Sequence, residues 1–135
     1  MDQHSITIIL PTYQEFDSLP SLIDAVEKLR DISLPNLQLT IVDDDSKDGT
    51  EQLITDMNKS WVTLITRTED RGLSPAVIAG LKTVTTDYCV VMDADGSHPT
   101  SAIPGMIEAL IQGADFVVGS RYITGGSTQD GWGVL

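Results

Sequence analysis

The sequence predicts a three-layer α/β fold in which helices cover both faces of a mostly parallel sheet. Short apolar segments alternate five times with helical segments along the 135 residues, which is the spacing of strand–helix–strand units. The apolar segments are continuous rather than alternating, as expected for strands buried on both faces. Three of them end in carboxylates or other polar residues. Right-handed crossovers should bring these ends to one edge of the sheet.

The first strand is predicted at residues 6–10, a continuous apolar run that Pro11 is expected to end. The next segment has Ser18 in an N-cap position and Pro20 in the first turn, both typical of a helix start. Its apolar residues recur at helical spacing, at Leu19, Leu22, Ile23, Val26 and Leu29.

The same reasoning predicts the remaining elements. Strands are expected at residues 37–42, 62–65, 88–92 and 116–118, and helices at residues 50–58, 75–84 and 101–112. Cys89 lies inside an apolar strand, so we interpret it as a small core residue rather than a nucleophile. A single cysteine also excludes a disulfide within the chain and fits a reducing cytoplasm.

Composition limits the classes of function. With 41% hydrophobic residues and no apolar run of about 18 residues, the chain is typical of a globular domain without a membrane helix. Residues 1–5 lack the basic start of a signal peptide. The formal net charge of −12 argues against nucleic-acid binding, which needs a basic face. An acidic protein can still bind a nucleotide diphosphate if a metal neutralises it.

The fourth predicted strand ends in Asp93 and Asp95, followed by Gly96. Carboxylates two residues apart leave an extended chain on the same side. A divalent cation bridging a diphosphate would relieve their repulsion, and Mg²⁺ or Mn²⁺ suits oxygen ligands. Three alternatives stay open: plain turn chemistry, half of an EF-hand loop, and the Asp-x-Asp-Gly-Thr signature of haloacid-dehalogenase phosphatases, which stands on a first strand rather than a late one.

The other two strand ends also carry candidate binding residues. A nucleobase can stack on Tyr13, and Glu15 and Asp44 can accept hydrogen bonds from a base or ribose. The alternative for Tyr13 is a packing role. The alternative for the acids of residues 43–48 is capping of the helix at Thr50 and formation of its turn. The sequence contains neither of the two common glycine-rich phosphate loops, Gly-x-x-x-x-Gly-Lys-Ser/Thr and Gly-x-Gly-x-x-Gly. The remaining candidates for binding phosphate are the cations Arg67, Arg71 and Arg121.

Five motifs occur in a recognisable order: Pro-Thr-Tyr-Gln-Glu at 11–15, Val-Asp-Asp-Asp-Ser-Lys-Asp-Gly-Thr at 42–50, Arg-Gly-Leu-Ser-Pro-Ala at 71–76, Asp-Ala-Asp-Gly-Ser-His-Pro at 93–99 and Gly-Ser-Arg-Tyr at 119–122. The set resembles family-2 glycosyltransferases, which have the Rossmann-like GT-A fold, and within them the dolichol-phosphate mannosyltransferase and polyprenyl-phosphate sugar transferase group. The resemblance implies an inverting transfer of a hexose from a GDP-mannose or UDP-glucose type donor to a polyprenyl phosphate.

The resemblance also implies roles for individual residues. The nucleoside pocket would be lined by Pro11, Tyr13, Glu15, Asp43 and Asp44. The catalytic set would be Asp93, Asp95 and Arg121, with Arg121 facing the phosphates. The metal, Mg²⁺ or Mn²⁺, would be held by Asp93, Asp95 and Ser97. The chain departs from the family at Gln14, at Ser74 and Pro75, at Gly96 and at Thr100.

For domain organisation, we expect a nucleotide-sugar-binding core at residues 1–122 and a glycine-rich loop at 123–135, where the sequence reads as truncated. Such a piece is expected to bind nucleotide without transferring sugar. The full-length protein is expected at the cytoplasmic face of a membrane. Two alternatives remain: transfer to a saccharide hydroxyl, and a non-catalytic nucleotide-binding or receiver-like module, although Pro11 and Arg67 stand where a receiver places its acids.

Overall fold

The computed structural model describes residues 5–92, 104–105, 108–109 and 112. The chain divides into two compact units, Met1–Thr100 and Ser101–Leu135. The first contains the strands β1 (Ile6–Thr12), β2 (Leu37–Asp43), β3 (Val62–Thr66) and β4 (Tyr88–Val91), and the helices α1 (Leu19–Ile32), α2 (Thr50–Met57) and α3 (Leu73–Leu81). In the second, residues 104–105 and 108–109 are helical. The predicted strand at residues 116–118 lies outside the described residues.

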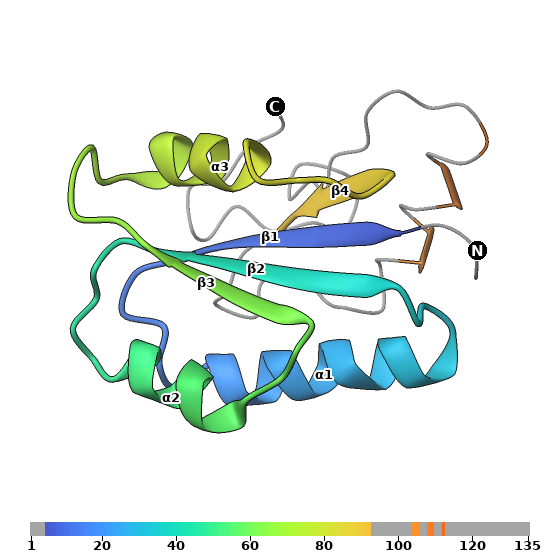
Figure 1. The fold of residues 1–135 in the computed structure, drawn as a ribbon, viewed down its shortest axis with the longest axis horizontal. Coiled ribbons are helices and arrows are strands. Elements are labelled where there is room, and N and C mark those ends of the chain that lie inside the picture. Colours follow the sequence, from blue (N-terminus) through green and yellow to red (C-terminus); the bar gives the residue numbers. More distant parts are fainter. Residues whose placement is uncertain (1–4, 93–103, 106–107, 110–111, 113–135) are drawn as a thin grey trace, which may run out of the picture. The chain divides into compact units, whose positions relative to one another are not determined.

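The four strands form one parallel sheet in the order β3-β2-β1-β4. Helices α1 and α2 lie on one face of this sheet and α3 lies on the other (Figure 1). The prediction of a three-layer α/β fold with a parallel sheet is therefore confirmed. Because all four strands run the same way, their carboxyl ends lie at one edge of the sheet.

The core is densest along the two central strands, because helices cover them from both sides. In β1 and β2 the isoleucine, leucine and valine side chains are completely buried, namely Ile6, Ile8, Ile9, Leu10, Leu37, Leu39, Ile41 and Val42. Ile9, Val42 and Ala76 form a cluster between the sheet and α3, and the half-buried Cys89 packs against it. Burial raises the pKa of the Cys89 thiol to about 11. The predicted core role of this cysteine is confirmed.

Strand β1 and helix α3 differ most from their predicted bounds, each with a proline at the misplaced boundary, and α3 also ends at Leu81 rather than at residue 84. Strand β1 continues through Pro11, which is in register with Val42 of β2. Ile9 accepts a hydrogen bond from the N–H of Met92, so its backbone faces β4. Pro11, two residues on, faces the same side beyond the end of β4, so its missing N–H breaks no described ladder bond.

Helix α3 begins at Leu73, two residues before the predicted start at Pro75. Pro75 then lies in the first turn of the helix, where backbone N–H groups have no partner within the helix. Its missing donor therefore costs nothing there. Ser18 stands at the N-cap of α1 as predicted, with Pro20 in the first turn, although its side chain makes no capping hydrogen bond.

Gly80 sets how closely α3 approaches the sheet, and we predict that Gly80→Ala destabilises the fold. An added Cβ would lie 2.7 Å from Cγ2 of Ile9 and 3.1 Å from Cγ2 of Val42. Overpacking a core costs about 1–3 kcal/mol, more than the ~1 kcal/mol that alanine contributes over glycine in a helix. Urea unfolding should show a lower free energy of unfolding.

The matched control is Gly105→Ala, because an added Cβ there meets no heavy atom within 4 Å. That substitution should leave the free energy of unfolding unchanged or raise it slightly. Equal effects of the two substitutions would contradict a tight contact between α3 and the sheet.

Candidate functional site

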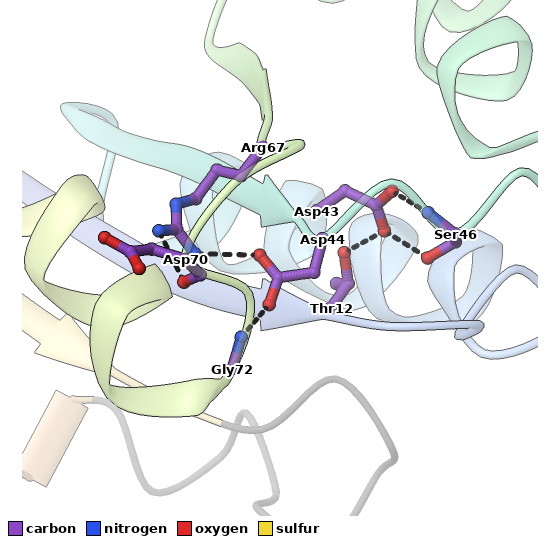
Figure 2. A network of polar contacts seen from close by, with 7 residues as sticks. All are labelled: Thr12, Asp43, Asp44, Ser46, Arg67, Asp70 and Gly72. Atoms are coloured by element: carbon purple, nitrogen blue, oxygen red, sulfur yellow. Dashed lines mark hydrogen bonds and ion pairs between the residues drawn. The ribbon is translucent and has the colours of Figure 1, made fainter.

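Three loops meet at the carboxyl edge of the sheet: those that follow β1, β2 and β3. They are joined by two neighbouring carboxylates, Asp43 and Asp44, at the end of β2 (Figure 2). Both side chains belong to buried residues, with exposed fractions of 4% for Asp43 and 5% for Asp44. A buried carboxylate needs partners that replace its lost hydration, and each of the two finds them in a different loop.

The Asp43 carboxylate joins the end of β1 to the turn after β2. Its Oδ1 accepts hydrogen bonds from the hydroxyl of Thr12 at 2.7 Å and from the hydroxyl of Ser46 at 2.6 Å. Its Oδ2 accepts a third from the backbone N–H of Ser46 at 2.9 Å. The Ser46 hydroxyl in turn accepts the N–H of Gln14 at 2.7 Å. This network fixes the backbone on both sides of Tyr13.

The Asp44 carboxylate joins β2 to the loop between β3 and α3. Its Oδ1 lies 3.0 Å from Nη1 of Arg67, and its Oδ2 accepts the backbone N–H of Gly72 at 2.6 Å. The guanidinium of Arg67 also donates to the carbonyl of Asp70 at 2.8 Å. Only 13% of the Arg67 side chain is exposed. Arg67, one of the predicted phosphate-binding cations, is therefore engaged by Asp44 inside the protein.

The turn after β2 also starts α2. Asp48 accepts the hydroxyl of Thr50 at 2.6 Å, its N–H at 3.2 Å, and the N–H of Phe16 at 3.3 Å. Partial burial acts to raise the pKa of Asp48, but the hydrogen bonds from Thr50 and Phe16 outweigh it and lower the pKa below 3.8. Gly49 occupies the N-cap of α2 and Asp48 precedes it, so the bonds of Asp48 support the turn-forming part of the alternative interpretation rather than capping of the helix.

Several non-glycine residues of these loops have left-handed backbone conformations. Gln14, Asp45 and Lys47 have φ values of 57°, 57° and 54°, and Asp70 has a φ of 50°. Such conformations are uncommon outside glycine and persist where surrounding contacts hold them. Here the hydrogen bonds of Asp43, Asp44 and Ser46 supply those contacts.

Tyr13 is the more exposed of two aromatic residues in the loop after β1, the other being Phe16. Its exposed fraction is 51%, and the guanidinium carbon of Arg71 lies 4.9 Å from the centroid of its ring. The other members of the predicted nucleoside pocket follow the same strand: Pro11 is half-buried, and the carbonyl of Glu15 accepts the N–H groups of Ser18 and Leu19. The structure thus brings Pro11, Tyr13, Asp43 and Asp44 to one edge.

The predicted metal and phosphate residues Asp93, Asp95, Ser97 and Arg121 lie outside the described residues. The strand that leads to them, β4, is parallel to β1, and Met92 is bonded to Ile9 at the end of that pairing. Within the described part of the chain, no three or more His, Cys, Asp or Glu side chains are grouped to hold a metal ion. No helix among these residues is long and apolar enough to cross a membrane.

Sequence reasoning missed Thr12, Ser46 and Gly72, which complete the contacts of the two carboxylates. The spacing Asp43-x-x-Ser46 carries a usable signal, because an aspartate often accepts a backbone N–H a few residues ahead in a turn. Thr12 and Gly72 belong to neighbouring loops, so only the pairing of the strands identifies them. The contact between Arg71 and Tyr13 joins residues 58 positions apart and has no local signal either.

The sequence pattern of glycosyl transferase family 2 matches residues 7–135. Among curated proteins, a dolichol-phosphate mannosyltransferase from Pyrococcus furiosus is 39% identical over 126 residues, which cover 93% of this chain and 35% of that protein. A polyprenol monophosphomannose synthase from Mycolicibacterium smegmatis is 34% identical over 129 residues, 91% of this chain and 47% of that protein. The chain therefore spans less than half the length of these relatives.

Solved structures show the same architecture. A mannosyltransferase from Pyrobaculum calidifontis, solved with GDP-mannose and Mn²⁺, matches with a TM-score of 0.60 and 29% identity over 68% of this chain and 28% of that protein. Mannosyl-3-phosphoglycerate synthase from Rubrobacter xylanophilus matches with a TM-score of 0.69 and 19% identity over 82% of this chain and 37% of that protein. These neighbours confirm the predicted GT-A fold.

We predict that Asp44→Asn strongly destabilises the chain, because it leaves the Arg67 guanidinium buried without its charge partner. Breaking a buried ion pair from one side costs about 3–5 kcal/mol. Urea unfolding measures the loss. The matched control is Asp24→Asn, which breaks an exposed 3.3 Å pair with Lys28 on α1 and should cost under about 1 kcal/mol. Similar losses in the free energy of unfolding for both variants would show that the ion pair between Asp44 and Arg67 does not stabilise the fold.

A second prediction concerns pH. Because the pKa of Asp48 is lower in the folded chain than in the unfolded chain, its ionised carboxylate stabilises the fold above the unfolded value near 3.8, and this contribution is lost as the pH falls through the folded pKa. Asp48→Asn should therefore reduce the free energy of unfolding at pH 6–7, and this effect should shrink as the pH falls below 3.8. The exposed Asp17→Asn is the control, and a pH-independent Asp48 effect would contradict the assignment.

Proposed function

Because the chain belongs to glycosyl transferase family 2, we propose that it binds a nucleotide diphosphate sugar at the carboxyl edge of its sheet and that the protein transfers the sugar, with inversion, to a polyprenyl or dolichyl phosphate. The observation that carries this proposal is the carboxyl edge of the sheet, where hydrogen bonds to Asp43 and Asp44 hold the loops beside Tyr13 in place. It lies beside the point between β1 and β4 where the strand order reverses, and open α/β sheets bind ligands at such points.

We assign the nucleoside end of the donor to Pro11, Tyr13, Glu15, Asp43 and Asp44. The exposed ring of Tyr13 offers a surface on which a base can stack. In the described conformation both buried carboxylates are engaged by protein donors. Asp43 and Asp44 therefore serve this pocket by holding its loops in place. We also propose that residues 1–122 make up the donor-binding core.

We assign the diphosphate end to the motif that follows β4. Asp93 and Asp95, with Ser97 nearby, would hold Mg²⁺ or Mn²⁺, and Arg121 would face the phosphates. A divalent ion bound there would neutralise the negative charge that develops on the departing nucleotide. The assignment is supported by the spacing of the two carboxylates and by the Mn²⁺ and GDP-mannose in the related Pyrobaculum structure. The described residues offer no competing group of metal ligands.

A lipid phosphate acceptor is supported by the names of the relatives, a dolichol-phosphate mannosyltransferase and a polyprenol monophosphomannose synthase. A phosphate monoester has a second pKa of about 6, so it is largely ionised at neutral pH and attacks without a general base. A saccharide hydroxyl would need such a base. With this acceptor we propose that the protein works at the cytoplasmic face of a membrane, where polyprenyl phosphates are reached from the water phase.

The donor half of the proposal predicts metal-dependent nucleotide binding. Isothermal titration of the chain with GDP and with UDP, each with and without Mn²⁺, should show binding of at least one nucleotide that strengthens with the metal. Asp95→Asn should weaken the metal-dependent binding by about 1–3 kcal/mol, the scale of a contact to a charged group, without lowering the melting temperature of the free chain. The proposal fails if neither nucleotide binds under any of these conditions.

A further inference from the structure

The carboxyl edge of the sheet has few cations available to an anionic ligand. Among the described residues of the three loops, the positive side chains are Lys47, Arg67 and Arg71. The ammonium of Lys47 lies 3.7 Å from the carboxylate of Asp45, and Arg67 is held by Asp44. Arg71 has no carboxylate partner within the described part of the chain, and its described contact is with the ring of Tyr13.

The contact with Tyr13 orients the Arg71 guanidinium without using its hydrogen-bond donors. The guanidinium carbon is 4.9 Å from the ring centroid, a distance typical of a cation over an aromatic face. The N–H groups of arginine lie in the guanidinium plane and form a fork that matches phosphate oxygens. The ring thus holds the cation in place while its donors stay available.

The backbone of Arg71 is fixed on both sides. The preceding carbonyl, of Asp70, accepts a hydrogen bond from Arg67, and the following N–H, of Gly72, donates to Asp44 (Figure 2). Tyr13 is fixed in the same way, because the hydroxyl of Thr12 and the N–H of Gln14 are bonded to the Asp43 and Ser46 network. Hydrogen bonds therefore fix the backbone next to both Arg71 and Tyr13. This lowers the conformational entropy that is lost when a ligand binds.

We propose that Arg71 is a donor-binding residue whose guanidinium, supported on the Tyr13 ring, contacts the diphosphate of the nucleotide sugar. The inference rests on the proposed donor function and assigns it a cation that lies on the β3–α3 loop rather than at the metal motif. Charge supports it: a chain with a net charge of −12 that binds a diphosphate gains most from a cation such as Arg71, which no carboxylate among the described residues neutralises. The exposed part of Tyr13 remains available to the nucleobase.

The number of phosphates on the ligand separates this role from a contact with the base. Isothermal titration in Mn²⁺ buffer would compare guanosine, GMP and GDP, or the uridine series if that base binds better. For Arg71→Gln we expect about tenfold or more weaker binding of GDP, a smaller loss for GMP and no change for guanosine. Arg71→Lys keeps the charge without the planar fork and should give an intermediate loss for GDP.

The charge-matched control is Lys82→Gln. Lys82 is the C-cap of α3, the helix that follows Arg71, so it lies at the opposite end of that helix. It should leave the affinity for all three ligands unchanged. Melting curves of each variant establish that the fold is intact, and Arg71 is exposed, so little change is expected.

The outcomes are distinguishable. If the wild-type chain binds none of the nucleotides, the proposed donor function fails, and this inference fails with it. If wild-type and Arg71→Gln bind GDP equally, or if guanosine binding weakens as much as GDP binding, the contact between Arg71 and the diphosphate is wrong while the donor function stands.

Discussion

The arrangement of the site depends on two adjacent carboxylates that leave β2 in opposite directions. Successive side chains of a strand point to opposite faces of the sheet. Asp43 therefore meets the turns that lead into α1 and α2, while Asp44 meets the loop that leads into α3. Burying charge is unfavourable unless partners replace the lost water. That requirement makes the loops converge on β2, since each carboxylate is satisfied only when its loop is in place.

The hydrogen bonds and ion pair of these two carboxylates also stabilise left-handed backbone conformations that isolated loops would avoid. Gln14, Asp45, Lys47 and Asp70 all have positive φ values, and all lie within the three loops held by the carboxylates. Conformations of this kind cost free energy and are found where binding geometry is set in advance. The loops are thereby held on rigid parallel strands rather than left to order themselves around a ligand, which favours a preorganised site.

The sequence predicted the layers and the alternation of strands and helices along the chain well, because continuous apolar runs and helical spacing are local signals. It placed the end of β1 too early, since whether Pro11 breaks a ladder depends on which neighbour its backbone faces. It also identified Asp43, Asp44 and Tyr13 as one group. It could not tell that the two acids are engaged by protein donors, because Arg67 and Gly72 are distant from Asp44 in sequence and only the pairing of β3 with β2 brings their loop to it.

Net charge is a poor guide to the potential at this edge. Asp44 is compensated by Arg67, Asp45 lies near Lys47, and Asp48 accepts N–H groups at the start of α2, where the helix dipole favours an anion. The negative charges of these three carboxylates are thus partly compensated by neighbouring groups. A ligand meets the electrostatic potential that remains after this compensation. Helix α3 is fixed at its start by the Gly72–Asp44 bond and along its length by the close approach of Gly80 to Ile9. A firmly placed α3 holds Arg71 at the edge, so the charge that matters for an anionic donor is set by packing rather than by composition.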